Sequence, residues 1–302
     1  MRKINFLILT IFCLFQFNNL NAQDHVFHKV AEGLKFPEGP AYDGNNTVYV
    51  SNCHGDFITK IVSNKQDVFI TVGEDVPHFK QTNGMTYHKD GFLYACEYGY
   101  GRILKFTPEG EEFIVADGYK GEHFNRPNDL AFNSKGDIYF SDPKSYGADK
   151  PDGRLFRINA ENNEVELLYD GLCFPNGIAV HPDEKELYLC ESAKNRILKF
   201  QFKDDGTVGE PTEFVVLPGG DPDGIAFDVE HNLWVAHFGT GTIFVISPDG
   251  KVLKEIKAPG KKPSNVEFAG KDMKTLYITE DETNCVYYTE VEVPGFVLFN
   301  QQ

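Results

Sequence analysis

Apolar and polar residues alternate with period two over many short stretches of the chain. The runs TVYVS from Thr47, FLYAC from Phe92 and DIYFS from Asp137 show this alternation, and each follows a cluster rich in Gly, Asp, Asn or Lys. Such alternation is typical of half-buried β-strands bounded by turns. No amphipathic segment of helical length lies between the strands. The pattern therefore predicts an all-β protein and argues against a parallel α/β barrel.

The strand pattern repeats six times, at intervals of 41 to 48 residues. The units begin with EGPAY at Glu38, NGMTY at Asn83, NDLAF at Asn128, NGIAV at Asn176, DGIAF at Asp223 and SNVEF at Ser264. Repeats of this length with about four strands match the blades of a β-propeller. The sequence thus predicts a six-bladed β-propeller with four-stranded antiparallel blades. We expect the strand-like piece from His25 to Val30 to complete the last blade and close the ring.

The first residues have the pattern of a processing signal. Arg2 and Lys3 precede an apolar run from Phe6 to about Phe17, and Leu20-Asn21-Ala22 follows. This order is typical of a cleaved secretory signal, and the run is shorter than the roughly 20 apolar residues of a membrane span. We expect residues 1–22 to be a signal peptide and residues 23–302 a single propeller domain. The mature protein would be exported, to the periplasm or the medium, with no membrane attachment after cleavage.

Charge and cysteine content narrow the class of partner. Lys and Arg number 29 against 45 Asp and Glu, so the formal net charge is −16. A field of this sign repels nucleic acid and anionic membranes, so we expect neither of them as a partner. Five cysteines follow the predicted signal, an odd number at scattered spacings. We expect them to be small buried apolar residues and not a disulfide framework.

The residues that head the six innermost strands all carry a side-chain oxygen. They are Glu38, Asn83, Asn128, Asn176, Asp223 and Ser264, and Pro precedes all of them except Asn83. Equivalent residues of propeller blades surround one axis, so these side chains are expected to form a ring. Two carboxylates and several amides suit a hard cation, and Ca²⁺ tolerates irregular geometry better than Mg²⁺. The ring holds no His or Cys, which argues against Zn²⁺.

A simpler interpretation is that Asn-Gly and Asp-Gly pairs recur only because they form turns. Two carboxylates and three amides in register favour the metal site, because turns alone would accept Ser or Gly equally well. Asn83 and Ser264 are the weaker members and could contact water or substrate instead.

Several motifs in order resemble the senescence-marker-protein, gluconolactonase and regucalcin-like family over roughly residues 30–293. They include FPEGPAY at Phe36, FNRPNDLAF at Phe124, FPNGIAVHPDEKELYL at Phe174 and DPDGIAFDVEHNLWVA at Asp221. The resemblance implies a six-bladed propeller that hydrolyses sugar or other lactones. It also implies Ca²⁺, or another divalent cation such as Zn²⁺, Mg²⁺ or Mn²⁺, on the axis.

The resemblance also implies roles for individual residues. The metal ligands would be Glu38, Asn176 and Asp223, with Asn128 completing the shell. Arg126 and Asn128 match the family's substrate-contacting Arg-x-Asn. Where some members carry an acidic substrate contact, this chain has Lys144-Ser145-Tyr146-Gly147, which leaves the identity of the sugar open.

The predicted mechanism follows from this ring. A cation polarises the lactone carbonyl, and Asp223 is the candidate general base, in line with the proton donor/acceptor role in the family. Arg126 would orient the substrate or the carboxylate product, unless it is only a surface arginine. His237 is a second candidate base, although a structural role is favoured. The carboxylates that end other second strands, Glu97, Asp142, Glu191 and Glu280, are expected to be solvated or bonded to turns.

Two other functions remain open on the sequence. A propeller with structural calcium could bind a carbohydrate or a protein without catalysis, because the scaffold alone does not define activity. A cation that polarises C=O can also polarise P=O, which would support phosphotriester hydrolysis. A lactone panel assayed with and without chelator separates these functions.

Overall fold

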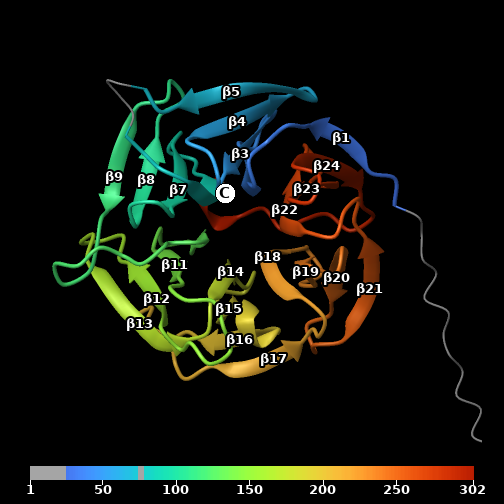
Figure 1. Cartoon of the computed structure of the whole chain (residues 1–302). Coiled ribbons are helices and arrows are strands. Elements are labelled where there is room, and N and C mark those ends of the chain that lie inside the picture. The colour runs from blue at the N-terminus through green and yellow to red at the C-terminus, as the bar shows by residue number, and fades with distance from the viewer. Residues whose placement is uncertain (1–24, 74–77) are drawn as a thin grey trace, which may run out of the picture.

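Period-two alternation produces strands throughout the molecule. In the computed structural model, which describes residues 25–73 and 78–302, the strands form six four-stranded antiparallel sheets arranged as a ring (Figure 1). The predicted all-β six-bladed propeller is confirmed. The predicted signal peptide, residues 1–22, lies outside the described residues.

Each sheet is one blade, and its strands follow each other outward from the axis. Blades 1 to 3 consist of β2 (Pro37–Tyr42), β3 (Thr47–Asn52), β4 (Phe57–Val62) and β5 (Lys65–Thr71); β6 (Thr82–Tyr87), β7 (Leu93–Glu97), β8 (Arg102–Phe106) and β9 (Glu112–Ala116); β10 (Leu130–Phe132), β11 (Ile138–Asp142), β12 (Gly153–Ile158) and β13 (Val165–Leu172).

The second half of the ring has the same construction. Blades 4 to 6 consist of β14 (Pro175–Val180), β15 (Glu186–Glu191), β16 (Arg196–Gln201) and β17 (Thr212–Val216); β18 (Asp221–Phe227), β19 (Leu233–Phe238), β20 (Thr242–Ile246) and β21 (Val252–Lys257); β22 (Pro263–Ala269), β23 (Thr275–Glu280), β24 (Cys285–Glu290) and β1 (His28–Ala31). Two 3₁₀ turns, η1 (Ser192–Lys194) and η2 (Phe299–Gln301), complete the elements. Among the described residues, no helix has the length and apolar character that crossing a bilayer requires.

The N-terminal strand closes the ring. β1 pairs antiparallel with β24, with His28 opposite Tyr288, so blade 6 combines the first strand of the chain with its last three strands. The inner strand of blade 1, β2, also contacts the inner strand of blade 6, β22. The prediction that a strand near His25 to Val30 completes the last blade is confirmed, with bounds His28–Ala31.

The core lies between neighbouring blades, where apolar faces of two sheets meet. Phe140 and Phe156 of blade 3 stack at 5.3 Å between ring centroids, and Cys96 of blade 2 packs in the same cluster. Cys96 and Cys190 are fully buried, as expected of small apolar residues. Burial of Cys53, Cys173 and Cys285 confirms the same prediction for the remaining three.

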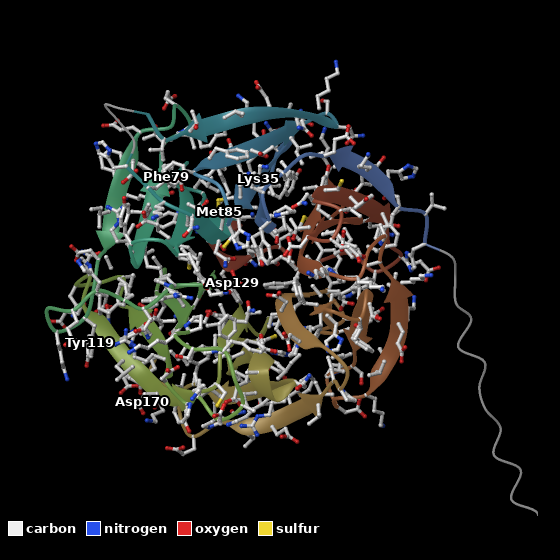
Figure 2. The ribbon with its side chains drawn as sticks, viewed as in Figure 1. Lys35, Phe79, Met85, Tyr119, Asp129 and Asp170 are labelled. Atoms are coloured by element: carbon white, nitrogen blue, oxygen red, sulfur yellow. The ribbon has the colours of Figure 1, made fainter. Side chains whose placement is uncertain are left out.

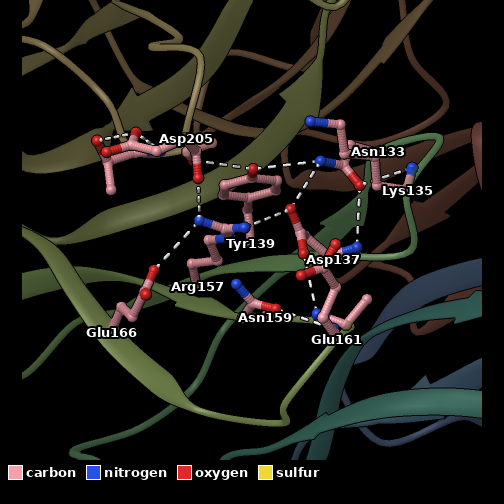
Figure 3. Close-up of polar contacts among 12 residues, drawn as sticks. Asn133, Lys135, Asp137, Tyr139, Arg157, Asn159, Glu161, Glu166 and Asp205 are labelled. Carbon is pink, nitrogen blue, oxygen red and sulfur yellow. Dashed lines mark hydrogen bonds and ion pairs between the residues drawn. The ribbon is translucent and has the colours of Figure 1, made fainter.

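A buried polar network joins blade 3 to the loop that follows β16 of blade 4 (Figure 3). Arg157 contacts the carboxylate of Asp137 at 2.9 Å and donates to the carbonyl of Asp205 at 2.7 Å. The Tyr139 hydroxyl donates to the carbonyl of Gly206 at 3.1 Å. Because buried polar groups must be paired, this network fixes the relative position of the two blades.

The C-terminal segment crosses one end of the propeller axis, and Figure 1 shows the C-terminus at the centre of the ring. Phe296 donates its backbone N–H to the carbonyl of Phe227 in blade 5. The amide of Asn300 donates to Thr86 in blade 2, and that of Gln301 donates to the carbonyl of Tyr42 in blade 1. These contacts close the end of the axis at which the inner strands finish, here called the C-terminal face.

Candidate functional site

Bulges in the inner strands turn the ring residues toward the axis. In five blades the register between the first and second strands shifts at the ring position, namely between Glu38/Ala41, Thr82/Met85, Pro175/Ile178, Pro222/Ile225 and Pro263/Asn265. A bulge bends its strand and redirects a side chain. The repeated irregularity therefore belongs to the construction of the site, at the end of the axis opposite the C-terminal face.

The glycine after the ring residue is needed because neighbouring inner strands approach closely. A Cβ at Gly177 would lie 2.0 Å from the carbonyl oxygen of Asp223, and one at Gly39 would lie 2.2 Å from that of Asn83. Both glycines lie inside strands, in β14 and β2. The simpler interpretation, that the pairs at the ring positions recur only because they form turns, is therefore wrong. The glycines of these pairs instead allow neighbouring inner strands to pack closely around the axis.

Five of the six ring residues line one cavity of about 220 Å³. They are Glu38, Asn83, Asn128, Asn176 and Asp223. Ser264 does not face this cavity, because its hydroxyl donates to the carbonyl of Pro37 at 2.8 Å and contacts the Thr279 hydroxyl. The predicted ring is thus open at blade 6.

The two ring carboxylates are buried without a cationic partner. Glu38 is 4% exposed and Asp223 is 7% exposed. Burial raises the pKa of Glu38 to about 8, and burial together with the charge of Glu38 raises the pKa of Asp223 well above its ordinary value. Within residues 25–73 and 78–302, no Lys or Arg forms an ion pair with either. Such a pair favours a bound cation, which would offset the cost of two buried charges.

The donor set fits a hard divalent cation that accepts amide oxygens. In the described part of the chain, no three His, Cys, Asp or Glu side chains converge closely enough to hold an ion by themselves. A cation near Glu38 and Asp223 would therefore depend on the Asn128 and Asn176 amides that line the same cavity. Carboxylate and amide oxygens together are a ligand set that Ca²⁺ accepts in proteins.

Asp129 is buried on the side of the ring that faces the C-terminal segment, and Figure 2 labels it near the centre of the molecule. Its carboxylate accepts the backbone N–H of Leu130 at 2.9 Å, and burial raises its pKa to about 7. It lines a separate cavity of about 60 Å³ together with Asn265 and Phe299. The axis therefore carries acidic groups below the ring as well as in it.

The acidic residues that end the second strands hold the loops leading to the ring. Asp142 accepts the backbone N–H of Arg126 at 2.8 Å, and Glu191 accepts that of Cys173 at 2.8 Å. Glu97 and Glu280 accept N–H groups at the corresponding loops of blades 2 and 6. All four are buried, so of the two environments expected for them, solvated or bonded to turns, the structure shows the second.

An arginine that opens the third strand supports three of these acids. Arg154 contacts Asp142 at 2.7 Å, and Arg196 contacts Glu191 at 2.6 Å. Arg102 pairs with Glu97 in blade 2. Each pair lies directly across two neighbouring strands, so an acid ending one strand and an Arg opening the next is a signal readable in the sequence.

Arg126 does not line the cavity, but it contacts Tyr98, which does, at the exposed mouth. Its side chain is exposed, its guanidinium lies 5.3 Å from the centre of the Tyr98 ring, and one of its nitrogens donates to the Tyr98 hydroxyl at 3.2 Å. Tyr98 lines the cavity. The location is compatible with contact to a substrate that enters from solvent.

A contact across the cavity mouth was not foreseen from the sequence. The exposed Tyr146 donates its hydroxyl to the Asp221 carboxylate at 2.9 Å, and its ring packs on Phe174 at 5.3 Å. All three residues line the cavity and come from three successive blades. The segment Lys144 to Gly147 marked Tyr146 as unusual, but no sequence signal connected it with Asp221.

Phe174 and Phe36 adopt left-handed backbone conformations two residues before their ring residues, with φ of 56° and 57°. Such conformations are costly for bulky residues and are common at functional sites. Here they accompany two aromatic side chains that line the cavity.

His237 is held by two hydrogen-bonding contacts. Its Nε2 lies 2.8 Å from the carbonyl oxygen of Leu217, and its Nδ1 lies 2.8 Å from the Thr240 hydroxyl. The ring is fully buried, and burial lowers its pKa. With both nitrogens engaged, His237 of β19 holds the loop before β18 in place, which leaves Asp223 as the candidate base.

Comparison with known proteins agrees with this architecture. Residues 114–281 match the family model of the SMP-30/gluconolactonase/LRE-like region. A 6-deoxy-6-sulfogluconolactonase of Pseudomonas putida is 34% identical over 221 residues, covering 68% of this chain and 75% of the relative. A gluconolactonase of Zymomonas mobilis is 30% identical over 283 residues, covering 83% and 77% respectively.

The fold is shared with a solved structure at lower identity. The calcium-binding protein regucalcin from Agrobacterium tumefaciens superposes with a TM-score of 0.77 at 18% identity, covering 91% of this chain and 97% of that one. At this identity the likeness concerns the fold alone. The match to the family model and the two relatives carry the assignment: the chain belongs to the SMP-30/gluconolactonase/LRE-like family.

Proposed function

We propose that the protein is a lactonase that opens a sugar or related lactone with the help of a divalent cation, Ca²⁺ in the first instance. The observation that carries the proposal is the cavity in which Glu38 and Asp223 lie buried beside Asn128 and Asn176, with no cationic partner among the residues that the structure describes. The names of the two relatives, both of them lactonases that act on gluconolactones, support the substrate class. The description of the regucalcin structure as calcium-binding supports the choice of cation.

The residues in and beside the cavity have defined parts in the proposed reaction. Glu38, Asn128, Asn176 and Asp223 would hold the cation, which when bound supplies the Lewis acid that polarises the lactone carbonyl. Asp223 accepts a proton from the attacking water and returns it to the leaving alkoxide, so the ring opens to a hydroxy acid. Arg126, stacked on Tyr98 at the mouth, orients the substrate and attracts the product carboxylate. Phe36, Phe174 and Phe238 narrow the cavity and limit bulk water.

The experiment is an assay of sugar and aliphatic lactones with metal-stripped protein, before and after addition of Ca²⁺. We expect turnover that depends on the cation. A carbohydrate- or protein-binding propeller would show no turnover at any metal concentration. A phosphotriesterase would instead hydrolyse a phosphotriester panel assayed in parallel.

Asp223→Asn separates the base from metal retention, because the amide keeps an oxygen at the site but accepts no proton. We expect hydrolysis to fall by at least the ~10²-fold typical of a lost general base. Bound metal is measured in the same samples, and added Ca²⁺ should not restore the rate. Near-normal kcat in metal-loaded Asp223→Asn would eliminate this residue as the base.

Arg126→Ala is the matched comparison at the cavity mouth. The side chain contacts Tyr98 and no ring residue, so its loss should raise KM or change substrate preference more than it lowers kcat. A loss confined to kcat would contradict the proposed positioning role.

We also propose that the protein is exported after removal of residues 1–22, because a basic start and an apolar run precede Ala22. The mass of the mature protein, purified by a C-terminal tag from cell fractions, tests this. A mature chain that retains Met1 in the cytoplasm would refute it.

A further inference from the structure

Blade 6 carries a buried carboxylate at the position that follows its second strand, behind the residues that line the cavity. Asp281 comes directly after β23 and donates its backbone N–H to the carbonyl of Lys262 at 2.9 Å. Cys53 and Ser192 make the same bond in blades 1 and 4, to residues that likewise lie two positions before the ring residue. Asp281 therefore has the same place in its blade as Cys53 and Ser192 have in theirs.

The residues at this place form a second tier above the ring. Cys53, Tyr98, Ser192 and Phe238, which hold it in blades 1, 2, 4 and 5, all line the cavity. Blade 6 lies between blade 5, which carries Asp223, and blade 1, which carries Glu38. Where Ser264 leaves the ring open, the second tier of the same blade thus supplies an acid between the two ring carboxylates.

Asp281 has no internal partner that explains its burial. It is 8% exposed, and neither carboxylate oxygen has a hydrogen-bond partner among the described residues. Burial and the charge of Glu38 raise its pKa to about 10, while Lys262 offsets this only in part. An unpaired buried carboxyl costs free energy, so a purely structural role would favour an apolar residue here.

We propose that Asp281 is a third carboxylate of the axial cation site, acting from behind the direct ligands to strengthen cation binding. The inference rests on the proposed function. Asp281 lies outside the set of direct ligands, because no three acidic side chains converge tightly enough to share an ion. Its contribution is the attraction between its charge and a cation held by Glu38 and Asp223, either through the intervening space or through a water that both contact. The acidic half of the site then spans blades 5, 6 and 1, opposite the amides of blades 2 to 4.

The test is calorimetric titration of CaCl₂ into metal-stripped wild type, Asp281→Asn and Asp204→Asn. Asp204 is an exposed acid in the loop after β16, so its variant removes the same formal charge far from the axis. We expect the Kd for Ca²⁺ to rise by about tenfold or more in Asp281→Asn and to change less than about twofold in Asp204→Asn. A Kd within twofold of wild type in Asp281→Asn would overturn the proposal.

Melting of the same samples supplies a second readout that does not depend on activity. Metal-free Asp281→Asn should melt no lower than wild type, because the carboxyl that it replaces has no hydrogen-bond partner among the described residues, and should gain less from Ca²⁺. If Asp281→Asn instead melts lower without metal and gains as much from Ca²⁺ as wild type does, the carboxylate is structural and the proposal is wrong. Asp281→Ser, measured in the same way, covers the case in which the amide itself disturbs folding.

The outcomes for this proposal and for the proposed function are distinct. If wild type binds Ca²⁺ and Asp281→Asn binds it with the same Kd, only the role of Asp281 is overturned. Wild type that binds no Ca²⁺ overturns both this role and the metal dependence of the lactonase.

Discussion

At the scale of single residues, burial without neutralisation defines the chemistry of the site. Glu38 and Asp223 are buried in the cavity, and the pKa of each is raised because desolvation disfavours the charged form. Asp129, below the ring, has its pKa raised to about 7 for the same reason. A cation beside such groups would keep them ionised, which is why the proposed metal site is at Glu38 and Asp223 and not at the well-paired acids Asp142 and Glu191.

These shifts predict an unusual pH dependence for the metal-free protein. The pKa of Glu38 is about 8 when folded, above its unfolded value, so the folded state holds more protons between the two values. Its contribution to stability is complete below the unfolded pKa and is lost as the pH rises through about 8. Metal-stripped protein should therefore melt at a lower temperature at pH 8.5 than at pH 5.5, and Ca²⁺ should restore the loss.

Glu38→Gln isolates this effect from general charge repulsion. The variant should show a smaller fall in melting temperature between pH 5.5 and pH 8.5 than wild type does. Each kcal/mol of unfolding free energy corresponds to about 2 to 4 °C in melting temperature. An equal pH dependence in the variant would show that Glu38 does not contribute.

At the scale of elements, the inner strands of blades 1, 2, 4 and 5 combine a bulge with a glycine. The bulge turns the ring side chain inward, and the glycine lets the next inner strand pass at a distance that no Cβ tolerates. The blade-end acids then hold the incoming loops through their backbone N–H groups. Strand, loop and ring position are therefore fixed together.

Gly177→Ala tests this packing, because the new Cβ would lie 2.0 Å from the Asp223 backbone oxygen. Backbone cannot yield as a flexible side chain can, so we expect a loss of at least about 3 kcal/mol in the free energy of unfolding. Gly209→Ala is the matched control, since its Cβ would meet only the Gln201 carbonyl at 3.8 Å. Urea denaturation of both variants decides, and similar stabilities would contradict the close-approach argument.

At the scale of the whole molecule, the two ends of the chain close the propeller in different ways. β1 completes blade 6 by pairing with β24, which joins the ends of the ring. The segment after Val293 covers the C-terminal face and bonds to blades 5, 2 and 1. The ring is therefore secured both around its circumference and across its axis.

Truncation after Val293 should destabilise the fold without removing a residue that lines the cavity around Glu38 and Asp223. The eight hydrogen bonds between this segment and the blades, among them those of Phe296, Asn300 and Gln301, would be lost at about 1 kcal/mol each, together with the packing of Phe296 and Phe299. We expect a lower melting temperature, and a much smaller change when only Gln302 is removed. An unchanged melting temperature after the longer truncation would mean that this segment does not secure the axis.

The sequence by itself determined the blades and most of the ring. Side chains of a strand alternate between two faces, so the runs around Tyr49, Tyr139 and Trp234 identify strands without knowledge of their partners. Repetition at 41 to 48 residues then requires equivalent places for Glu38, Asn128, Asn176 and Asp223 around one axis, and the cavity contains all four.

Only the tertiary structure decided which side chains meet across blades. Ser264 has the ring position in sequence but bonds to Pro37 of blade 1, and Tyr146 reaches Asp221 two blades away. Asp281 directly follows the buried acid Glu280 at the end of β23. Among the described residues, its own carboxylate oxygens have no hydrogen-bond partner. These outcomes depend on the bulge, on the approach of neighbouring strands and on which groups share a buried space. A repeat pattern assigns each residue to its blade, but the partner that a buried side chain finds is set by the blades on either side.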